Sequence, residues 1–221
     1  MVISALTRRP SLDLCRVLPA RGSASIARVS GLVLALICAS CRTIPVREIA
    51  PVQSWNARRA QLQERAAFEL KGRVAVAVGS EGFNARLRWM QQGTASHLAL
   101  DGPLGAGGVQ VTSDGSRLSV VTSKGERLDS EAARGELAAR LGFDPPLSSL
   151  RFWMLGVPDP GGAPAQELLD EPRQHLAHLQ QDGWEIDYGG YMPAGGESLP
   201  AKLTLQRQNI RVRVIVDGWG S

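Results

Sequence analysis

Apolar and polar residues alternate with a period of two along much of this 221-residue chain. In residues 68–78 the apolar positions are Phe68, Leu70, Val74, Val76 and Val78. In residues 83–90 they are Phe83, Ala85, Leu87 and Trp89. A period of two is that of a β-strand with one buried face. We therefore expect two long strands, joined by the turn Gly79-Ser80-Glu81-Gly82.

Shorter alternating segments follow, and residues such as Gly, Asp and Ser separate them. They contain the pairs Leu98/Leu100, Val109/Val111, Leu118/Val120, Leu176/Leu179, Leu203/Leu205 and the runs 184–188 and 210–216. Strands joined by short turns pair in antiparallel fashion. The chain is therefore predicted to be mainly β, with strands that follow one another as a meander.

Three helical segments interrupt the strands. The first, over residues 52–66, follows Pro51 and places Trp55, Arg59 and Leu62 on one face. The second spans 129–141, with Asp129 or Ser130 at its N-cap and Gly142 after its last residue. The third, over 147–155, is apolar nearly all round. Residues 159–166, rich in Pro, Gly and Ala, are predicted to form a loop.

A curved sheet with one apolar face must cover that face. Helices or a second sheet could do so and form an ordinary core, or the helices could form a lid over a cavity that holds acyl chains. Periodicity alone favours the ordinary core, because stripes of Val, Leu and Trp are usually packed against one another.

The N-terminus has the pattern of an export signal. Residues 29–39 form an apolar run of eleven, preceded by arginines. Such a run rises only about 16 Å as a helix, half the thickness of a bilayer core, so a permanent span is not expected. A buried helix of the domain is the alternative. We expect a signal peptide over 1–40, a tether over 41–51 and a single domain over 52–221.

The end of this signal resembles a bacterial lipobox. In Ile37-Cys38-Ala39-Ser40-Cys41, small residues precede a cysteine that would be lipidated and become the mature N-terminus. Cys15 and Cys38 would leave with the leader, so the mature chain would have no internal disulfide. An unmodified thiol at Cys41 is the alternative.

The net charge of +4 belongs to the leader. Residues 1–40 contain five arginines and one aspartate, which leaves residues 41–221 electrically balanced. This distribution argues against a nucleic-acid surface on the folded part, because such surfaces need an excess of Lys and Arg.

Signals for catalysis are weak. The chain has three histidines, His97, His175 and His178, and the last two would face opposite sides of a strand. We interpret them as solvated surface residues. No phosphate-binding glycine loop and no G-x-S-x-G nucleophile motif occurs in the sequence. We expect no enzyme activity, no cofactor and no metal.

The loop 101–108 contains one large apolar side chain, Leu104, among glycines and a proline. A loop this rich in glycine buries little surface. Whether Leu104 projects into solvent or packs back onto the sheet is evenly balanced on the sequence.

Taken together, the segments resemble the LolB family of outer-membrane lipoproteins, from about Trp55 to Trp219. The most specific parts are Phe83-Asn84-Ala85-Arg86-Leu87-Arg88-Trp89, Pro103-Leu104-Gly105, the run 146–156 and Tyr188-Gly189-Gly190-Tyr191. Their order and spacing behind a lipobox carry the resemblance, more than any single motif.

The resemblance implies an open antiparallel half-barrel with a helical lid over a hydrophobic cavity. Such a protein is anchored in the outer membrane through a lipid on Cys41. It would take lipoproteins from the periplasmic carrier LolA and insert them into outer-membrane lipid without ATP. Leu104 matches an exposed leucine that this family needs for membrane insertion. We expect a monomer whose domain faces the periplasm.

The alternation and the resemblance together assign residues to the cavity and its lid. The predicted acyl-chain cavity comprises Val74, Val76, Phe83, Leu87, Trp89, Leu98 and Leu100, and the predicted lid contacts are Leu150, Trp153 and Leu155. Two rivals remain: a structural lipoprotein with a packed core and no cargo, and a hydrolase built around the histidines.

Overall fold

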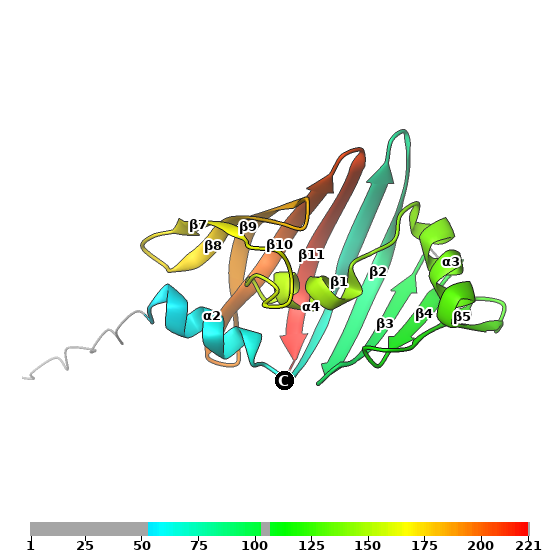
Figure 1. The fold of residues 1–221 in the computed structure, drawn as a ribbon, viewed down its shortest axis with the longest axis horizontal. Coiled ribbons are helices and arrows are strands. Elements are labelled where there is room, and N and C mark those ends of the chain that lie inside the picture. Colours follow the sequence, from blue (N-terminus) through cyan, green and yellow to red (C-terminus); the bar gives the residue numbers. More distant parts are fainter. Residues whose placement is uncertain (1–52, 103–106, 221) are drawn as a thin grey trace, which may run out of the picture. The chain divides into compact units, whose positions relative to one another are not determined.

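A computed structural model describes residues 53–102 and 107–220 of the chain (Figure 1). The predicted signal peptide, the tether and the lipid-attachment residue Cys41 lie outside these ranges, as does Leu104. Within these ranges no helix is both long and apolar enough to cross a membrane.

Strands make up most of the described chain. Their bounds are β1 (Ala67–Val78), β2 (Glu81–Gln92), β3 (Ala95–Asp101), β4 (Val109–Ser113), β5 (Leu118–Thr122), β6 (Arg127–Asp129), β7 (Gln166–Asp170), β8 (His175–Gln181), β9 (Trp184–Ala194), β10 (Glu197–Arg207) and β11 (Ile210–Gly220). The helices are α2 (Trp55–Gln63), α3 (Ser130–Leu141) and α4 (Leu147–Met154).

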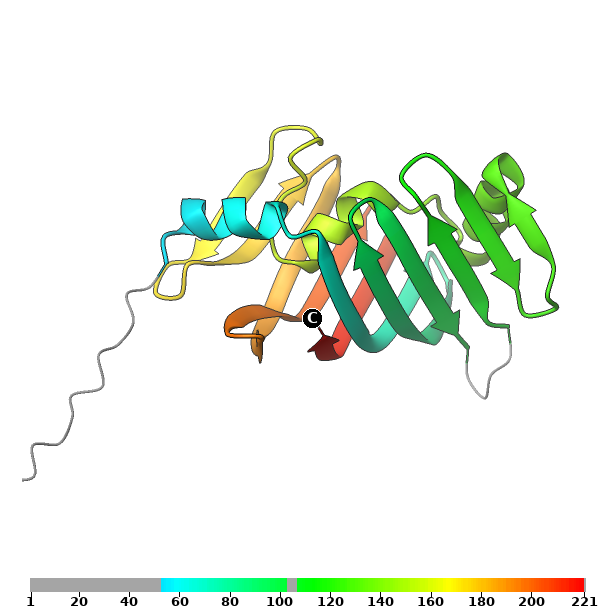
Figure 2. The same ribbon diagram turned by 90° about the horizontal axis from the view of Figure 1, so that it is seen from below.

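All of these strands belong to one antiparallel sheet in the order β6-β5-β4-β3-β2-β1-β11-β10-β9-β8-β7. Two meanders, β1–β6 and β7–β11, join where β1 pairs with β11. The edge strands β6 and β7 are not neighbours, so the sheet stays open. It curves around the helices like a trough (Figure 2). The predicted mainly β, open antiparallel half-barrel with helices is confirmed.

The junction between the two meanders depends on a glycine and a β-bulge. Lys71 pairs with Gly218 and Gly72 with Val216, which leaves Asp217 as an extra residue on β11. A Cβ atom built on Gly72 would lie 2.3 Å from the Ile215 carbonyl oxygen, closer than any side chain tolerates. Gly72 therefore allows the long strands to approach and bend at this point.

The helices lie near their predicted positions. α3 ends as predicted at Gly142, which adopts the left-handed conformation (φ +78°) and donates its N–H to the Ala138 carbonyl at 2.8 Å. On α2, Trp55 and Arg59 lie on one side as predicted, since both donate to the Glu167 carboxylate. Arg58 is buried as well, and its guanidinium donates to the Ser198 carbonyl oxygen.

Two strands had no expected counterpart. β6 is three residues long and mostly exposed, so it carries no alternation to detect. β7 pairs with β8 through a register shift, because Ala177 on β8 is an extra residue between the partners of Leu168 and Leu169. Both are edge strands, so their residues are more exposed to solvent and less constrained by packing against a core.

His175 and His178 lie on β8, on either side of this register shift. His178 is partly exposed, and its Nδ1 lies 2.8 Å from an Asp187 carboxylate oxygen. His175 is buried and stacks on the Tyr191 ring, with centroids 4.3 Å apart. The prediction that both are solvated is therefore wrong for His175. Burial lowers its pKa, and the nearby positive charge of Arg58 lowers it further.

Candidate functional site

The inner face of the sheet and the helices enclose an apolar cavity. Strands β1 to β4, β9, β10 and β11 form its floor and walls, and α3, α4 and the segment between them cover it. The lining residues are Val74, Val76, Leu87, Trp89, Leu98, Leu100, Val111, Leu137, Leu141, Phe143, Pro145, Pro146, Leu147, Leu150, Trp153, Met154, Trp184, Leu205, Val212 and Val214. Every one of these side chains is hydrophobic, and their lining carries no exposed polar surface.

The polar atoms of the lining tryptophans are mostly satisfied away from the cavity. The Trp153 indole N–H donates to Gln181 Oε1 at 2.9 Å, and the Trp89 N–H donates to Gln91 Oε1 at 3.0 Å. The Trp184 N–H is buried and has no acceptor among the described residues. What the cavity offers a ligand is therefore apolar contact.

The space inside is small in this structure, about 90 Å³. A dry protein cavity of about 150 Å³ holds a benzene molecule. The cavity as described therefore cannot contain an acyl chain of a dozen or more carbons. A chain of that length would need the covering helices to move away from the sheet.

The covering helix α4 is bonded both to the sheet and to the loop that follows it. At its C-terminal end the Tyr188 hydroxyl donates to the Trp153 carbonyl oxygen at 3.0 Å, and burial raises the pKa of that tyrosine well above its usual range. In its first turn the Ser149 hydroxyl donates to an Asp159 carboxylate oxygen at 2.7 Å. The helix begins after Pro145 and Pro146, which line the cavity, and no side chain caps its N-terminus.

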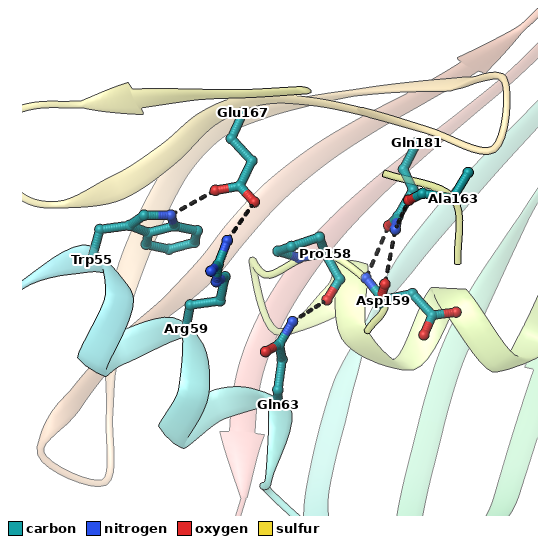
Figure 3. Close-up of polar contacts among 8 residues, drawn as sticks. All are labelled: Trp55, Arg59, Gln63, Pro158, Asp159, Ala163, Glu167 and Gln181. Atoms are coloured by element: carbon teal, nitrogen blue, oxygen red, sulfur yellow. Dashed lines mark hydrogen bonds and ion pairs between the residues drawn. The ribbon is translucent and has the colours of Figure 1, made fainter. Parts of the chain in front are cut away.

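A buried glutamine ties the loop after α4 to the sheet (Figure 3). Gln181 on β8 accepts from the Asp159 N–H at 2.9 Å and donates to the carbonyls of Asp159 and Ala163 at 2.8 and 2.9 Å. Together with the Trp153 bond, its side chain makes four hydrogen bonds. This amide therefore anchors both the loop and the end of α4.

A second set of contacts holds α2 against the same region (Figure 3). Glu167 on β7 accepts from the Trp55 indole at 2.6 Å and from Arg59 at 3.0 Å. Gln63 at the end of α2 donates to the Pro158 carbonyl oxygen at 2.9 Å. The helix that follows the predicted tether thus contacts the loop that continues from α4.

A polar groove of about 470 Å³ adjoins the cavity. The two share Leu137, Pro145, Pro146 and Leu147, so the segment between α3 and α4 separates them. On the groove side the lining includes several serines, Thr94 and three arginines: Arg117, Arg134 and Arg151. An apolar interior therefore meets a polar surface at this rim.

Most of the residues predicted for the cavity lie together in it. Val74, Val76, Leu87, Trp89, Leu98 and Leu100 all line it, as do Leu150 and Trp153 of the predicted lid. Phe83 lies near the start of β2, opposite Val76, half-buried and outside the lining. Leu155 is fully buried in the core and does not reach the cavity.

The other twelve of the twenty lining residues were not predicted for the cavity or its lid. Val212, Val214 and Leu205 carry the same alternation as β1, but only the long-range pairing of β1 with β11 brings them to the cavity. Phe143, Pro145 and Pro146 lie in a short linker without periodicity. Their apolar character between two helices was the available signal.

The described part of the chain shows no metal-binding cluster of three or more His, Cys, Asp or Glu residues. His97 is exposed on the outer side of β3, His175 is buried against the Tyr191 ring, and His178 is partly exposed and contacts Asp187. These three residues therefore do not form one catalytic group.

Comparisons with known proteins point to one family. The family model described as outer membrane lipoprotein LolB matches residues 66–219. An outer-membrane lipoprotein LolB from Nitrosococcus oceani is 33% identical, covering 87% of this chain and 96% of the relative. One from Halorhodospira halophila is 30% identical over 86% and 93%. A crystal structure of a DUF1329 family protein from Desulfovibrio piger is similar in fold, with TM-score 0.53, 7% identity and coverage of 75% of this chain and 89% of that one.

Proposed function

This chain belongs to the family of outer-membrane lipoproteins LolB, and from that premise we propose that it receives lipoproteins from a periplasmic carrier and inserts them into the outer membrane. The carrier is the LolA protein that the family resemblance implies. In this proposal the chain acts by binding and release, without catalysing a reaction. Cargo acyl chains occupy the cavity between the sheet and α4.

The observation that carries this proposal is an enclosed space lined by apolar side chains only. Each buried CH₂ group of an acyl chain contributes about 0.8 kcal/mol. A lipoprotein that crosses an aqueous compartment therefore needs an apolar refuge at every stage. Transfer without ATP then needs only a tighter-binding acceptor at each step, with about 1.4 kcal/mol for each tenfold gain in affinity.

Loading requires the space to grow, because about 90 Å³ is far less than an acyl chain occupies. We place the movement at the proline end of α4 and the segment 143–146. The C-terminal end is held by Gln181 and Tyr188. Outward movement of the segment would also open the cavity toward the polar groove, where the headgroup and peptide of a cargo could remain solvated.

Two residues outside the described ranges complete the proposal. Cys41 would carry the lipid that keeps the domain at the outer membrane, and Leu104 would enter the bilayer during the insertion step. Leu104 and Cys41 thus belong to membrane contact, whereas the cavity residues belong to cargo binding.

The rival function is a structural lipoprotein with a packed core. The small size of the cavity is the observation that favours it. A direct test mixes the purified chain with a carrier–lipoprotein complex and follows the lipoprotein by affinity capture. We expect the lipoprotein to change hands, and its retention on the carrier would reject the receptor function in favour of the rival.

A Leu104→Glu variant separates acceptance from insertion. It should accept cargo from the carrier but fail to insert it into liposomes. Leu168→Glu is the matched control, because Leu168 is a leucine 62% exposed on the edge strand β7. Loss of both steps in Leu104→Glu, or equal loss in the control, would contradict a separate role for Leu104.

A further inference from the structure

The outer face of the central strands carries an excess of positive charge. Opposite the apolar inner face, β1, β2, β10 and β11 present exposed basic side chains, which we call the cationic face: Lys71, Arg73, Arg86, Arg88, Lys202, Arg211 and Arg213. The acidic side chains at the outward positions of β1, β3 and β11 are Glu69, Asp101 and Asp217, and the neighbouring strand β9 adds Glu185 and Asp187. Because the chain after residue 40 is electrically balanced, this excess is a local feature.

Strand register places like charges directly opposite one another. Lys71 pairs with Arg88, and Arg73 pairs with Arg86. Like charges at directly opposed positions destabilise a sheet. This repulsion between like charges remains in the folded chain, and an anionic partner would reduce it.

Internal ion pairs compensate only part of this charge. Arg73 is bonded to Asp217 at 2.9 Å, and Arg88 to Asp101 at 2.8 Å. Within residues 53–102 and 107–220, the other five basic residues of the cationic face have no carboxylate within 4.0 Å: Lys71, Arg86, Lys202, Arg211 and Arg213. Their exposed, uncompensated charge is available to a partner.

The composition of the face indicates a lipid surface more than a protein. Protein interfaces are enriched in arginine, but they also depend on aromatic anchors in well-packed pockets. The outward positions of β10, β11, β1, β2 and β3 include no aromatic ring other than the imidazole of His97. Met90, 43% exposed beside Arg88, is the one large exposed hydrophobic residue that they present. Dispersed cations of this kind attract anionic headgroups without needing a complementary shape.

We propose that the cationic face rests on the anionic phospholipids of the membrane in which the protein is anchored. This inference rests on the proposed function for its location at a bilayer. In that orientation the concave side, with α2, α3 and α4, points away from the lipid (Figure 2). The cavity and its polar rim then face the aqueous compartment from which a carrier arrives.

The lysines of the chain provide a test, because there are three in all: Lys71, Lys124 and Lys202. Two belong to the cationic face, and Lys124 is exposed in the turn between β5 and β6. The full lipidated chain is incorporated into vesicles of phosphatidylethanolamine, with or without phosphatidylglycerol. It is then treated with a water-soluble amine reagent, and labelling at each lysine is measured by mass spectrometry.

We expect phosphatidylglycerol to protect Lys71 and Lys202 several-fold, with Lys124 labelled equally in both vesicles and with protection lost at high salt. Arg86→Gln and Arg213→Gln should each weaken the contact about fivefold, which corresponds to the attraction of one cation to an anionic surface. Arg127→Gln, which removes an exposed arginine of β6 outside the cationic face, should leave the labelling pattern unchanged.

Equal labelling of Lys71 and Lys202 in both vesicles would overturn the inference. Protection confined to Lys124 would also overturn the inference, because another face of the domain would then contact the bilayer. Protection that appears only when the carrier is added would assign the cationic face to an acidic protein instead. Cargo transfer is measured in the same vesicles, so failure of the orientation and failure of the proposed function give different results.

Discussion

Filling the cavity should stabilise the fold while it abolishes cargo binding, and Val74→Phe is the substitution that tests this. Val74 lies on β1 at the cavity wall, 8% exposed, and its register partner on β2 is the small residue Ala85. A larger side chain at this position has unfilled space in front of it and only a methyl group on its β2 side, with Val214 on its β11 side.

The size of the effect follows from the volume. Unfilled apolar space in a core destabilises a protein by about 24 cal/mol per Å³. For about 90 Å³ this amounts to about 2 kcal/mol, which is the upper limit of what filling could recover. We therefore expect Val74→Phe to change the free energy of unfolding by between 0 and about +2 kcal/mol.

Urea unfolding and binding of a fluorescent fatty acid measure the two effects separately. The matched control is Val120→Phe, on β5, because Val120 is fully buried and does not line the cavity. Overpacking there should destabilise the protein by about 1–3 kcal/mol. A Val74→Phe protein that is stable and still binds the fatty acid like the unchanged chain would refute the assignment of the cavity to acyl chains.

Three further predictions concern the framework around the cavity. Gln181→Leu leaves the N–H groups of Trp153 and Asp159 without acceptors. Urea titrations should therefore show a free energy of unfolding lower by about 2–4 kcal/mol. The control Gln180→Leu, at the exposed neighbouring residue, should change this free energy little. Glu167→Ala removes the bonds to Trp55 and Arg59, so amide hydrogen exchange in α2 should accelerate while exchange in β1 stays slow; equal acceleration in both would contradict a local role. The pKa of His175 is lowered by burial and by Arg58, with Arg173 adding to this and Asp170 opposing it. The unfolded chain therefore binds a proton at higher pH than the folded chain, so stability should fall as pH falls through about 6.5, and a His175→Gln variant that keeps the same pH slope would reject this origin.

Strand positions were predictable from sequence because one face of the sheet is buried. Val74, Leu87 and Leu98 occupy alternate positions in their strands. A period of two places each of them on the buried face of the sheet. The helix end at Gly142 was predictable for an equally local reason, since its left-handed backbone favours glycine. These features depend on the residue and its immediate neighbours.

The rest depended on contacts between distant parts of the chain. Pairing of β1 with β11 joins residues about 140 positions apart, and it brings Val212 and Val214 into the cavity. Arg58 is buried on α2, where its guanidinium donates to the carbonyl of Ser198, a residue 140 positions away in the chain. Leu155 and Phe83 had the right character for the site, but where they lie in the fold keeps them out of the lining.

The central claim is that cargo acyl chains enter the space between the sheet and α4. A lipoprotein that carries a photoreactive group on one acyl chain is loaded from the carrier onto the purified chain, irradiated, and the adducts are mapped by mass spectrometry. We expect adducts on residues of the cavity lining such as Leu98, Leu150 and Trp153. Adducts confined to the outer face of the sheet, with the lining unmodified, would contradict it.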